Sequence, residues 1–359
     1  MTWRHHIRRI KRVLALMLAI SFILLQVGCG KQQDQAGQQQ APRKLVVTSY
    51  GGAYEEFFRS EVIPSFEKEY NCKVELAVGL AKDWLAKMRA AGPDNPPYDV
   101  VMTNEIWASQ ERAEGFFVPL PSDKVPNLKD VHPLLRNKDD NGVLGIIQPI
   151  GIAYRTDRVK NPPTSWKDLW KPEYKGKLGL YTITNSAGMM FVTLVSKVFT
   201  GDEHNIDVAL EEIKKLKPFK QTDFSGDMEK LLSQGEIDIG ILDSPAVARL
   251  RHQGLPIGWV APTEGVYMFE QDFNVTKGSK VKDLAYAWID YNLRPEVQEK
   301  WMRKFYTTPA NVKVSVPPEL QSDIPIYGDK LQSIITWDWK WINQEKQSLT
   351  EKWNKEFTR

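Results

Sequence analysis

The feature that most constrains the fold is a strand-like run that leads through two glycines directly into a helical pattern. Residues 45–47 (Leu-Val-Val) are typical of a buried strand, and Gly51-Gly52 separate them from a helical pattern that begins at Ala53. Such a turn leaves backbone N–H groups free at the carboxyl edge of a sheet, where open α/β sheets bind ligands. The first wall of a binding cleft is therefore predicted at Ser49, Tyr50, Gly51, Gly52 and Tyr54.

The same alternation of strand and helix recurs along the chain. Strand-like runs cover residues 45–47, 74–78, 98–102, 178–181 and 237–242. Helical patterns between them cover residues 53–62, 83–91, 107–114, 187–198, 208–216 and 228–234. This alternation predicts an α/β fold whose sheets are rich in parallel strands.

Two long extended segments divide the chain into two lobes. Residues 145–154 contain four isoleucines and are interrupted by Pro149, which we interpret as a crossover into a second lobe, and residues 267–275 lead back. A chain of 359 residues is too long for one core. We predict lobe 1 at 44–149 and 266–312, and lobe 2 at 150–265 and 313–359. Lobe 2 ends in helices whose tryptophans we expect to pack against the body, namely Trp337, Trp339, Trp341 and Trp353.

The first 28 residues have the features of an export signal. A basic start is followed by an apolar run from Val13 to Leu25 and by Gly28-Cys29. The pattern predicts a lipoprotein signal peptide at 1–28, with lipid on Cys29, although Gln26 stands where such signals normally carry leucine. Residues 29–43 are rich in Gln and predict a flexible tether. The chain is therefore expected to be exported and held in the periplasm or at the cell surface.

The charge and the cysteines exclude other classes of protein. Without the five basic residues of the signal, 43 basic and 45 acidic side chains remain, a net charge of −2, so nothing suggests a nucleic-acid partner. If Cys29 carries lipid, Cys72 has no partner for a disulfide and is expected to be a buried thiol.

No pattern indicates an enzyme, a metal site or a cofactor. His132, His204 and His252 stand apart without HxH or HExxH spacing, and no Walker-type glycine loop is present. We therefore expect no catalytic residues.

Five segments, in order and at matching spacing, carry a family resemblance. They are residues 98–101 (YDVV), 161–177 (NPPTSWKDLWKPEYKGK), 235–239 (GEIDI), 292–296 (NLRPE) and 306–311 (YTTPAN). The chain thereby resembles spermidine/putrescine periplasmic binding proteins. The resemblance implies a monomeric solute-binding protein of an ABC importer, with the two hinged α/β lobes of the type II periplasmic-binding fold. It also implies that a small charged organic ligand is delivered to the permease's transmembrane subunits.

Residues that face the cleft are predicted from strand-to-helix turns and from the resemblance. Besides the first wall, three other turns are predicted to supply cleft residues, namely Thr103, Glu105, Trp107, Thr184, Asn185, Ser186 and Asp243. The resemblance implies four more: Phe269, Gln271, Asp272 and Tyr306. An alternative exists for five of these residues. Asp243 and residues 184–186 could instead only cap helices, and Glu105 could be a solvated acid in a first helical turn.

The sequence leaves two classes of ligand possible. A polyamine, the leading candidate, needs carboxylates at its ends and aromatic faces along its middle, and Glu105, Asp243, Glu270 and Asp272 are candidate carboxylates. Where polyamine receptors carry acids at the start of a second-lobe helix, however, residues 184–186 are Thr-Asn-Ser. Neutral groups at a helix N-terminus suit an anion, so a carboxylate, a phosphonate or a zwitterion is the alternative. A sensory ligand-binding protein is a more distant one.

Overall fold

The computed structural model describes residues 42–138 and 141–357. The predicted signal peptide, Cys29 and nearly all of the predicted tether lie outside the described residues. Among the helices of the described part, none is long and apolar enough to cross a membrane. Cys72 is buried and free, as predicted, and burial raises the pKa of its thiol.

The strands form a mixed sheet in the order β2-β1-β3-β10-β5-β8-β6-β7. One parallel group consists of β1 (Arg43–Ser49), β2 (Cys72–Val78) and β3 (Val100–Thr103), and the other of β6 (Leu178–Tyr181), β7 (Lys220–Thr222) and β8 (Ile239–Asp243). Between them run β5 (Val143–Arg155) and β10 (Tyr267–Thr276), antiparallel to each other and to the strands β8 and β3 that flank them. Short strands extend the pairing, namely β4 (Phe117–Val118), β9 (Ile257–Val260) and β11 (Thr308–Pro309).

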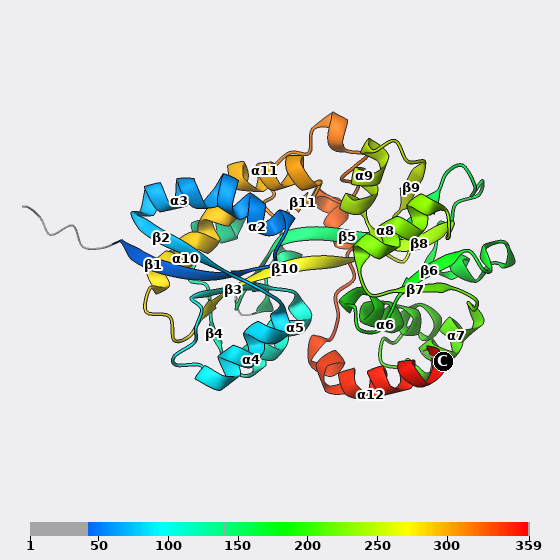
Figure 1. Cartoon of the computed structure of the whole chain (residues 1–359), viewed down its shortest axis with the longest axis horizontal. Helices are drawn as coiled ribbons and strands as arrows, with labels where there is room; N and C mark the ends of the chain where they lie inside the picture. The colour runs from blue at the N-terminus through cyan, green and yellow to red at the C-terminus, as the bar shows by residue number, and fades with distance from the viewer. Residues whose placement is uncertain (1–41, 139–140, 358–359) are drawn as a thin grey trace, which may run out of the picture. The chain divides into compact units, whose positions relative to one another are not determined.

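The predicted α/β class and two-lobed type are confirmed, and the centre of the sheet is more antiparallel than predicted. The two long segments predicted as crossovers are β5 and β10 (Figure 1). They run in opposite directions because one leads the chain out of the first strand group and the other leads it back. Residues that alternate along these two strands can therefore point to opposite sides of the sheet.

Helices follow the strands as the alternation predicts. The first group of strands is accompanied by α2 (Ala53–Phe57), α3 (Ile63–Tyr70), α4 (Ala81–Ala91), α5 (Glu105–Ala113), α10 (Lys282–Asn292) and α11 (Pro295–Phe305). The second is accompanied by α6 (Ser186–Thr200), α7 (Ile206–Lys215), α8 (Ser225–Gln234), α9 (Ser244–His252) and the C-terminal α12 (Trp339–Phe357). The helix predicted at 53–62 is α2 continued by a π-helical turn over Phe58–Val62.

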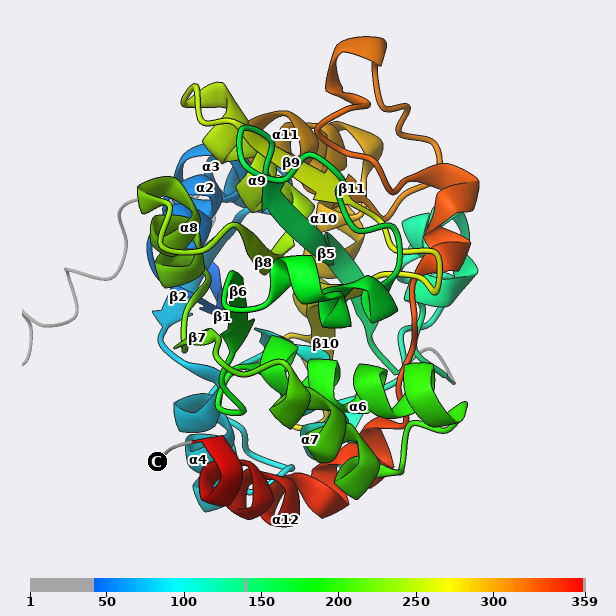
Figure 2. The ribbon, with the colours of Figure 1, turned by 90° about the vertical axis from the view of Figure 1, so that its right-hand side faces the viewer.

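Two large hydrophobic clusters each include residues of β5 and β10. The first is built around β1 and α3 and includes Phe66 and Trp288; the second is built around α6 and includes Trp166. The C-terminal α12 packs into the second cluster, where Trp353 is buried, and Figure 2 shows it beside α7. The predicted packing of the C-terminal tryptophans is thus confirmed. Ile334, earlier in the same tail, belongs to the first cluster, and the boundaries of the lobes stay a prediction.

Candidate ligand-binding site

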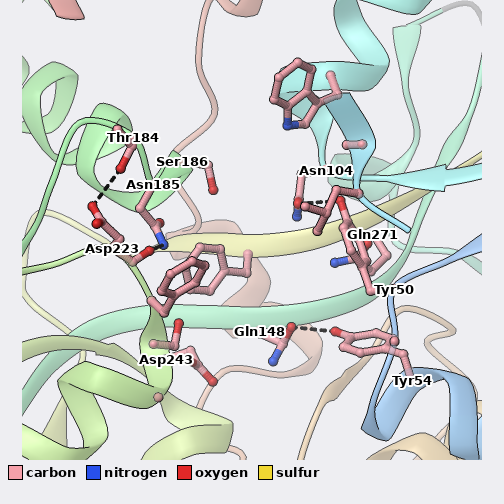
Figure 3. Close-up of a pocket in the computed structure, with 18 of the residues that line it drawn as sticks. Tyr50, Tyr54, Asn104, Gln148, Thr184, Asn185, Ser186, Asp223, Asp243 and Gln271 are labelled. Atoms are coloured by element: carbon pink, nitrogen blue, oxygen red, sulfur yellow. Dashed lines mark hydrogen bonds between the residues drawn. The ribbon is translucent and has the colours of Figure 1, made fainter. Parts of the chain in front are cut away.

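A cavity of about 730 Å³ lies between the ends of α2, α4 and α5 and those of α6, α8 and α9, with β5 and β10 at its base. It is large enough for a small organic ligand. Ten of the residues predicted from the sequence line it: Tyr50, Gly51, Tyr54, Trp107, Thr184, Asn185, Ser186, Asp243, Phe269 and Gln271. In Figure 3 residues 184–186, Asp223 and Asp243 lie on one side, and the two tyrosines, Asn104 and Gln271 on the other. Both parts of the chain thus supply walls, as the two-lobe prediction requires.

Two predicted carboxylates point away from this cavity. Glu105 and Asp272 both pair with Arg112, at 2.9 Å from Glu105 Oε1 to Nη1 and 2.5 Å from Asp272 Oδ2 to Nη2. Both are buried, Glu105 at the start of α5 and Asp272 on β10, and neither lines the ligand cavity. Asp272 lies one residue beyond Gln271, so on an extended strand its side chain turns to the opposite face of β10.

Four other predicted residues do not line the cavity. Ser49 and Thr103 are buried; the hydroxyl of Ser49 donates to the carbonyl of Tyr50, and that of Thr103 lies 3.4 Å from the Tyr50 hydroxyl. Gly52 supplies the left-handed turn, with φ of 68°, that starts α2. Tyr306 follows α11 and stacks on the ring of His252 instead. Ser49, Thr103 and Gly52 therefore shape the first wall from behind.

The first wall presents neutral tyrosines held by amides. The Tyr50 hydroxyl donates to Asn104 Oδ1 at 3.0 Å, and the Tyr54 hydroxyl donates to Gln148 Oε1 at 2.8 Å. Burial raises the pKa of Tyr50 to about 12 and that of Tyr54 further, so both keep their protons at neutral pH. The amide oxygens fix the orientation of the rings, whose faces can cover an organic cation.

The second wall contains a carboxylate that sequence reasoning missed. Asp223 accepts hydrogen bonds from the hydroxyls of Thr182 and Thr184, the latter at 2.8 Å, and its backbone carbonyl accepts from Asn185 Nδ2 at 2.9 Å. The hydrogen bonds from Thr182 and Thr184 lower the pKa of Asp223, so the group is ionised at neutral pH. Because it follows the three-residue strand β7, the local pattern was too short to reveal another strand-to-helix turn.

Asp243 is both a helix cap and a cavity residue. Its Oδ1 accepts a hydrogen bond from the Ala246 N–H at 3.0 Å, which caps α9, and its side chain also lines the cavity. Burial raises the pKa of Asp243 to about 6, and the positive charge of Arg249 opposes that rise. Arg249 lines the cavity too and pairs with Glu229 at 3.0 Å. The capping alternative considered for Asp243 is therefore correct but does not exclude a ligand contact.

Residues 184–186 also start a helix while they line the cavity. Asn185 caps α6 through a hydrogen bond from the Ala187 N–H at 2.8 Å. The next turn is close-packed, because a Cβ on Gly188 would lie 2.0 Å from the carbonyl oxygen of Thr182. The loop that carries Thr184 and Asn185 can thus be displaced by a single methyl group.

We expect Gly188→Ala to lower the melting temperature by several degrees and to weaken ligand binding, since the helix and the 182–186 loop must move apart. Gly226→Ala is a matched control in the first turn of α8, where an added Cβ meets nothing within 4 Å. Gly226→Ala should leave the melting temperature nearly unchanged. Thermal unfolding of the two variants, with calorimetric titration of Gly188→Ala, checks this; an equal fall in melting temperature in both variants would contradict it.

Residues from several other turns complete the cavity. They are Leu80, Ala81, Lys82, Asn104, Gln148, Asp223, Phe224, Ser225, Gly226 and Arg249. Asn104 lies inside a turn that the alternation did predict, between Thr103 and Glu105. Gln148 is a polar side chain in an otherwise apolar extended run, a signal that could have been used. Within the described ranges, no group of three His, Cys, Asp or Glu side chains is placed to hold a metal ion.

Comparisons with known proteins find relatives in both sequence and fold. A family model described as bacterial extracellular solute-binding protein matches residues 61–326. The spermidine/putrescine-binding periplasmic protein of Escherichia coli (strain K12) is 27% identical over 306 residues, which cover 82% of this chain and 86% of that protein. The crystal structure of an ABC transporter protein from Clostridium perfringens superposes with a TM-score of 0.77 at 28% identity, covering 87% of this chain and 99% of the other. The spermidine/putrescine substrate-binding protein of Streptococcus pneumoniae gives a TM-score of 0.69 at 21% identity, with coverage of 88% and 99%.

Proposed function

The chain belongs to the bacterial extracellular solute-binding protein family, and from this premise we propose that it captures a small organic amine of the polyamine class. It is a substrate-binding protein of an ABC transporter and not an enzyme; its partners are a small-molecule ligand and an ABC permease. Membership of this family fits an exported protein. Lipid on Cys29 would hold the chain, as a monomer, at the outer face of the cytoplasmic membrane.

The observation that supports an amine is the combination of carboxylates and aromatic rings around one cavity. Asp243 and Asp223 lie on one side, and Tyr50 and Tyr54 on the other (Figure 3). A carboxylate supplies a charge-assisted hydrogen bond to an ammonium group, and each aromatic face adds roughly 0.5–2 kcal/mol. Similarity to spermidine/putrescine-binding relatives supports the same class.

The two ends of the amine meet different chemistry. The carboxylates come from the turns before α8 and α9, whereas the wall that carries the tyrosines offers the amides of Asn104, Gln148 and Gln271. One ammonium group is therefore held by Asp243 or Asp223. The rest of the ligand lies along the rings and donates hydrogen bonds to amide oxygens.

A zwitterion is the second candidate, because the cavity also contains cationic and N–H groups. Arg249 and Lys82 line it, and the N-terminus of α8 next to Asp223 has no side-chain cap. Free N–H groups at a helix start favour a carboxylate. A ligand with an ammonium group on Asp243 and a carboxylate at this helix would use both features.

A matched pair of ligands separates the two candidates. Putrescine and 4-aminobutyrate have the same carbon chain, but one carries a second ammonium group where the other carries a carboxylate. We expect putrescine or spermidine, at a hundredfold excess over Kd, to raise the free energy of unfolding of the purified protein by about 2–3 kcal/mol in a thermal unfolding experiment. 4-Aminobutyrate should raise it less. A larger effect of 4-aminobutyrate would support the zwitterion. Stabilisation by succinate alone would overturn the proposal.

A further inference from the structure

Strand β10 separates the ligand cavity from a second cavity. Phe269 and Gln271 line the first, while Met268 and Glu270, which alternate with them along the strand, line a cavity of about 420 Å³. The volume is within the range of small-molecule sites. The function proposed above does not use this second cavity.

About half of the residues that line the second cavity are apolar, and these come from both hydrophobic clusters. Leu144 and Met268 belong to the first cluster, and Met190 to the second, against which Trp337 and Trp339 also pack. Methionine and tryptophan side chains are polarisable surfaces that attract organic cations and alkyl groups. The cavity is thus shaped for an apolar body rather than for water alone.

At one wall of the cavity lies a buried carboxyl group whose bonding is incomplete. Glu270 is 3% exposed, and its Oε1 accepts a hydrogen bond from the Glu105 N–H at 2.7 Å. Its Oε2 has no hydrogen-bond partner among the described residues. Because Glu270 lines the cavity, this oxygen is an acceptor available to a ligand.

The nearest buried cation does not satisfy Glu270. The guanidinium of Arg112 is occupied by Glu105 and Asp272. Burial raises the pKa of Glu270 to about 8, and Asp272 adds to that rise. An ammonium group beside Glu270 would take the place of the proton that this carboxyl group holds at neutral pH, and the resulting ion pair would also be neutral.

We propose that this second cavity binds a small organic monoammonium ion, with its charge on Glu270 and its apolar body against Met190, Met268 and the two tryptophans. A polyamine fits poorly, because Lys138 lines the same cavity and would repel a second ammonium group. The site therefore differs from the ligand cavity in both its position and its preferred charge.

Methionine methyl groups report directly on the second cavity. The whole protein is labelled with methyl-¹³C methionine and titrated at pH 8 with isopentylammonium. We expect the methyl signals of Met190 and Met268, assigned from single Met→Leu variants, to shift and saturate. The signals of Met228, in the second cluster, and of Met302, in a separate small cluster with Val316 and Ile324, should stay unchanged. Isopentanol, which has the same shape without the charge, should produce shifts only at about tenfold higher concentration or above.

Two variants make the test specific. Glu270→Gln keeps the shape and the acceptor for the Glu105 N–H but removes the charge, and should weaken the isopentylammonium response about tenfold or more. Asp243→Asn disables the ligand cavity and should leave the Met190 and Met268 responses unchanged, so failure of the proposed function is distinguishable from failure of this site. Loss of both responses in Asp243→Asn, an unaltered titration in Glu270→Gln, or methyl signals that never move would each overturn the proposal.

Discussion

Replacing Asp243 by asparagine is expected to weaken binding of putrescine or spermidine by about 30-fold or more, because the ligand's ammonium group loses its buried carboxylate. The fold should survive the change. Asparagine has nearly the same shape and retains the oxygen that accepts the Ala246 N–H, and it caps helices as well as aspartate does. Calorimetric titration of the variant, with its melting temperature measured alongside, checks both parts.

Asp223→Asn is the matched comparison, since Asp223 lines the same cavity but is exposed. Exposed ion pairs are screened by solvent, so the loss of affinity should be less than about tenfold. If Asp243→Asn binds the amine as the wild type does, Asp243 acts only as the cap of α9. If Asp223→Asn alone abolishes binding, the ammonium group lies at the start of α8.

Replacing Glu111 by glutamine is expected to stabilise the protein at high pH by several degrees in melting temperature. Glu111 is fully buried on α5, and neither of its carboxyl oxygens has a hydrogen-bond partner in the part of the chain that the structure describes. Burial raises the pKa of Glu111 to about 8, and the charge of Asp272 adds to the rise. Ionising this side chain in the folded protein is therefore unfavourable, while glutamine never ionises.

The sign of the pH dependence follows from proton binding. Between the unfolded pKa of about 4.3 and the folded pKa of about 8, the folded state holds a proton on Glu111 that the unfolded state has released. The free energy of unfolding therefore decreases as pH rises through this interval and stays low above it. The variant's advantage over the wild type should be larger at pH 9 than at pH 5.

Thermal unfolding of both proteins at the two pH values measures this difference. Glu56→Gln, on an exposed residue of α2, is the control and should show no such trend. A melting-temperature difference between Glu111→Gln and the wild type that is the same at both pH values would contradict the expectation. It would mean that Glu111 does not titrate in this range in the folded protein.

Most of the first wall could be predicted because its signals are local. The run at 45–47, the glycine pair and the helical pattern after them are contiguous, so Tyr50, Gly51 and Tyr54 could be placed at a sheet edge without any tertiary information. The same reasoning reached Trp107 and Asp243. It missed Asp223, since a strand of three residues leaves almost no periodic pattern.

The carboxylates show where local reasoning ends. Glu105 and Asp272 were predicted to face the ligand, yet both neutralise Arg112, which is 160 residues before Asp272 in the chain. No pattern around any of the three residues reveals that pairing. A buried arginine takes whichever carboxylates the packing brings to it, and those contacts exist only after β10 pairs with β3 beside α5.

The sequence by itself determined the strand-to-helix units, the crossover segments and the family resemblance, because periodicity and turn residues act over a few positions. Only the tertiary structure decided which face of β10 serves each cavity: Phe269 and Gln271 face the ligand cavity, and Met268 and Glu270 the second one. Alternation along a strand determines that neighbouring side chains point to opposite faces of the sheet. It does not determine which of these side chains face the ligand cavity. That choice depends on the register with β5 and β3, and hence on contacts between residues far apart in the chain.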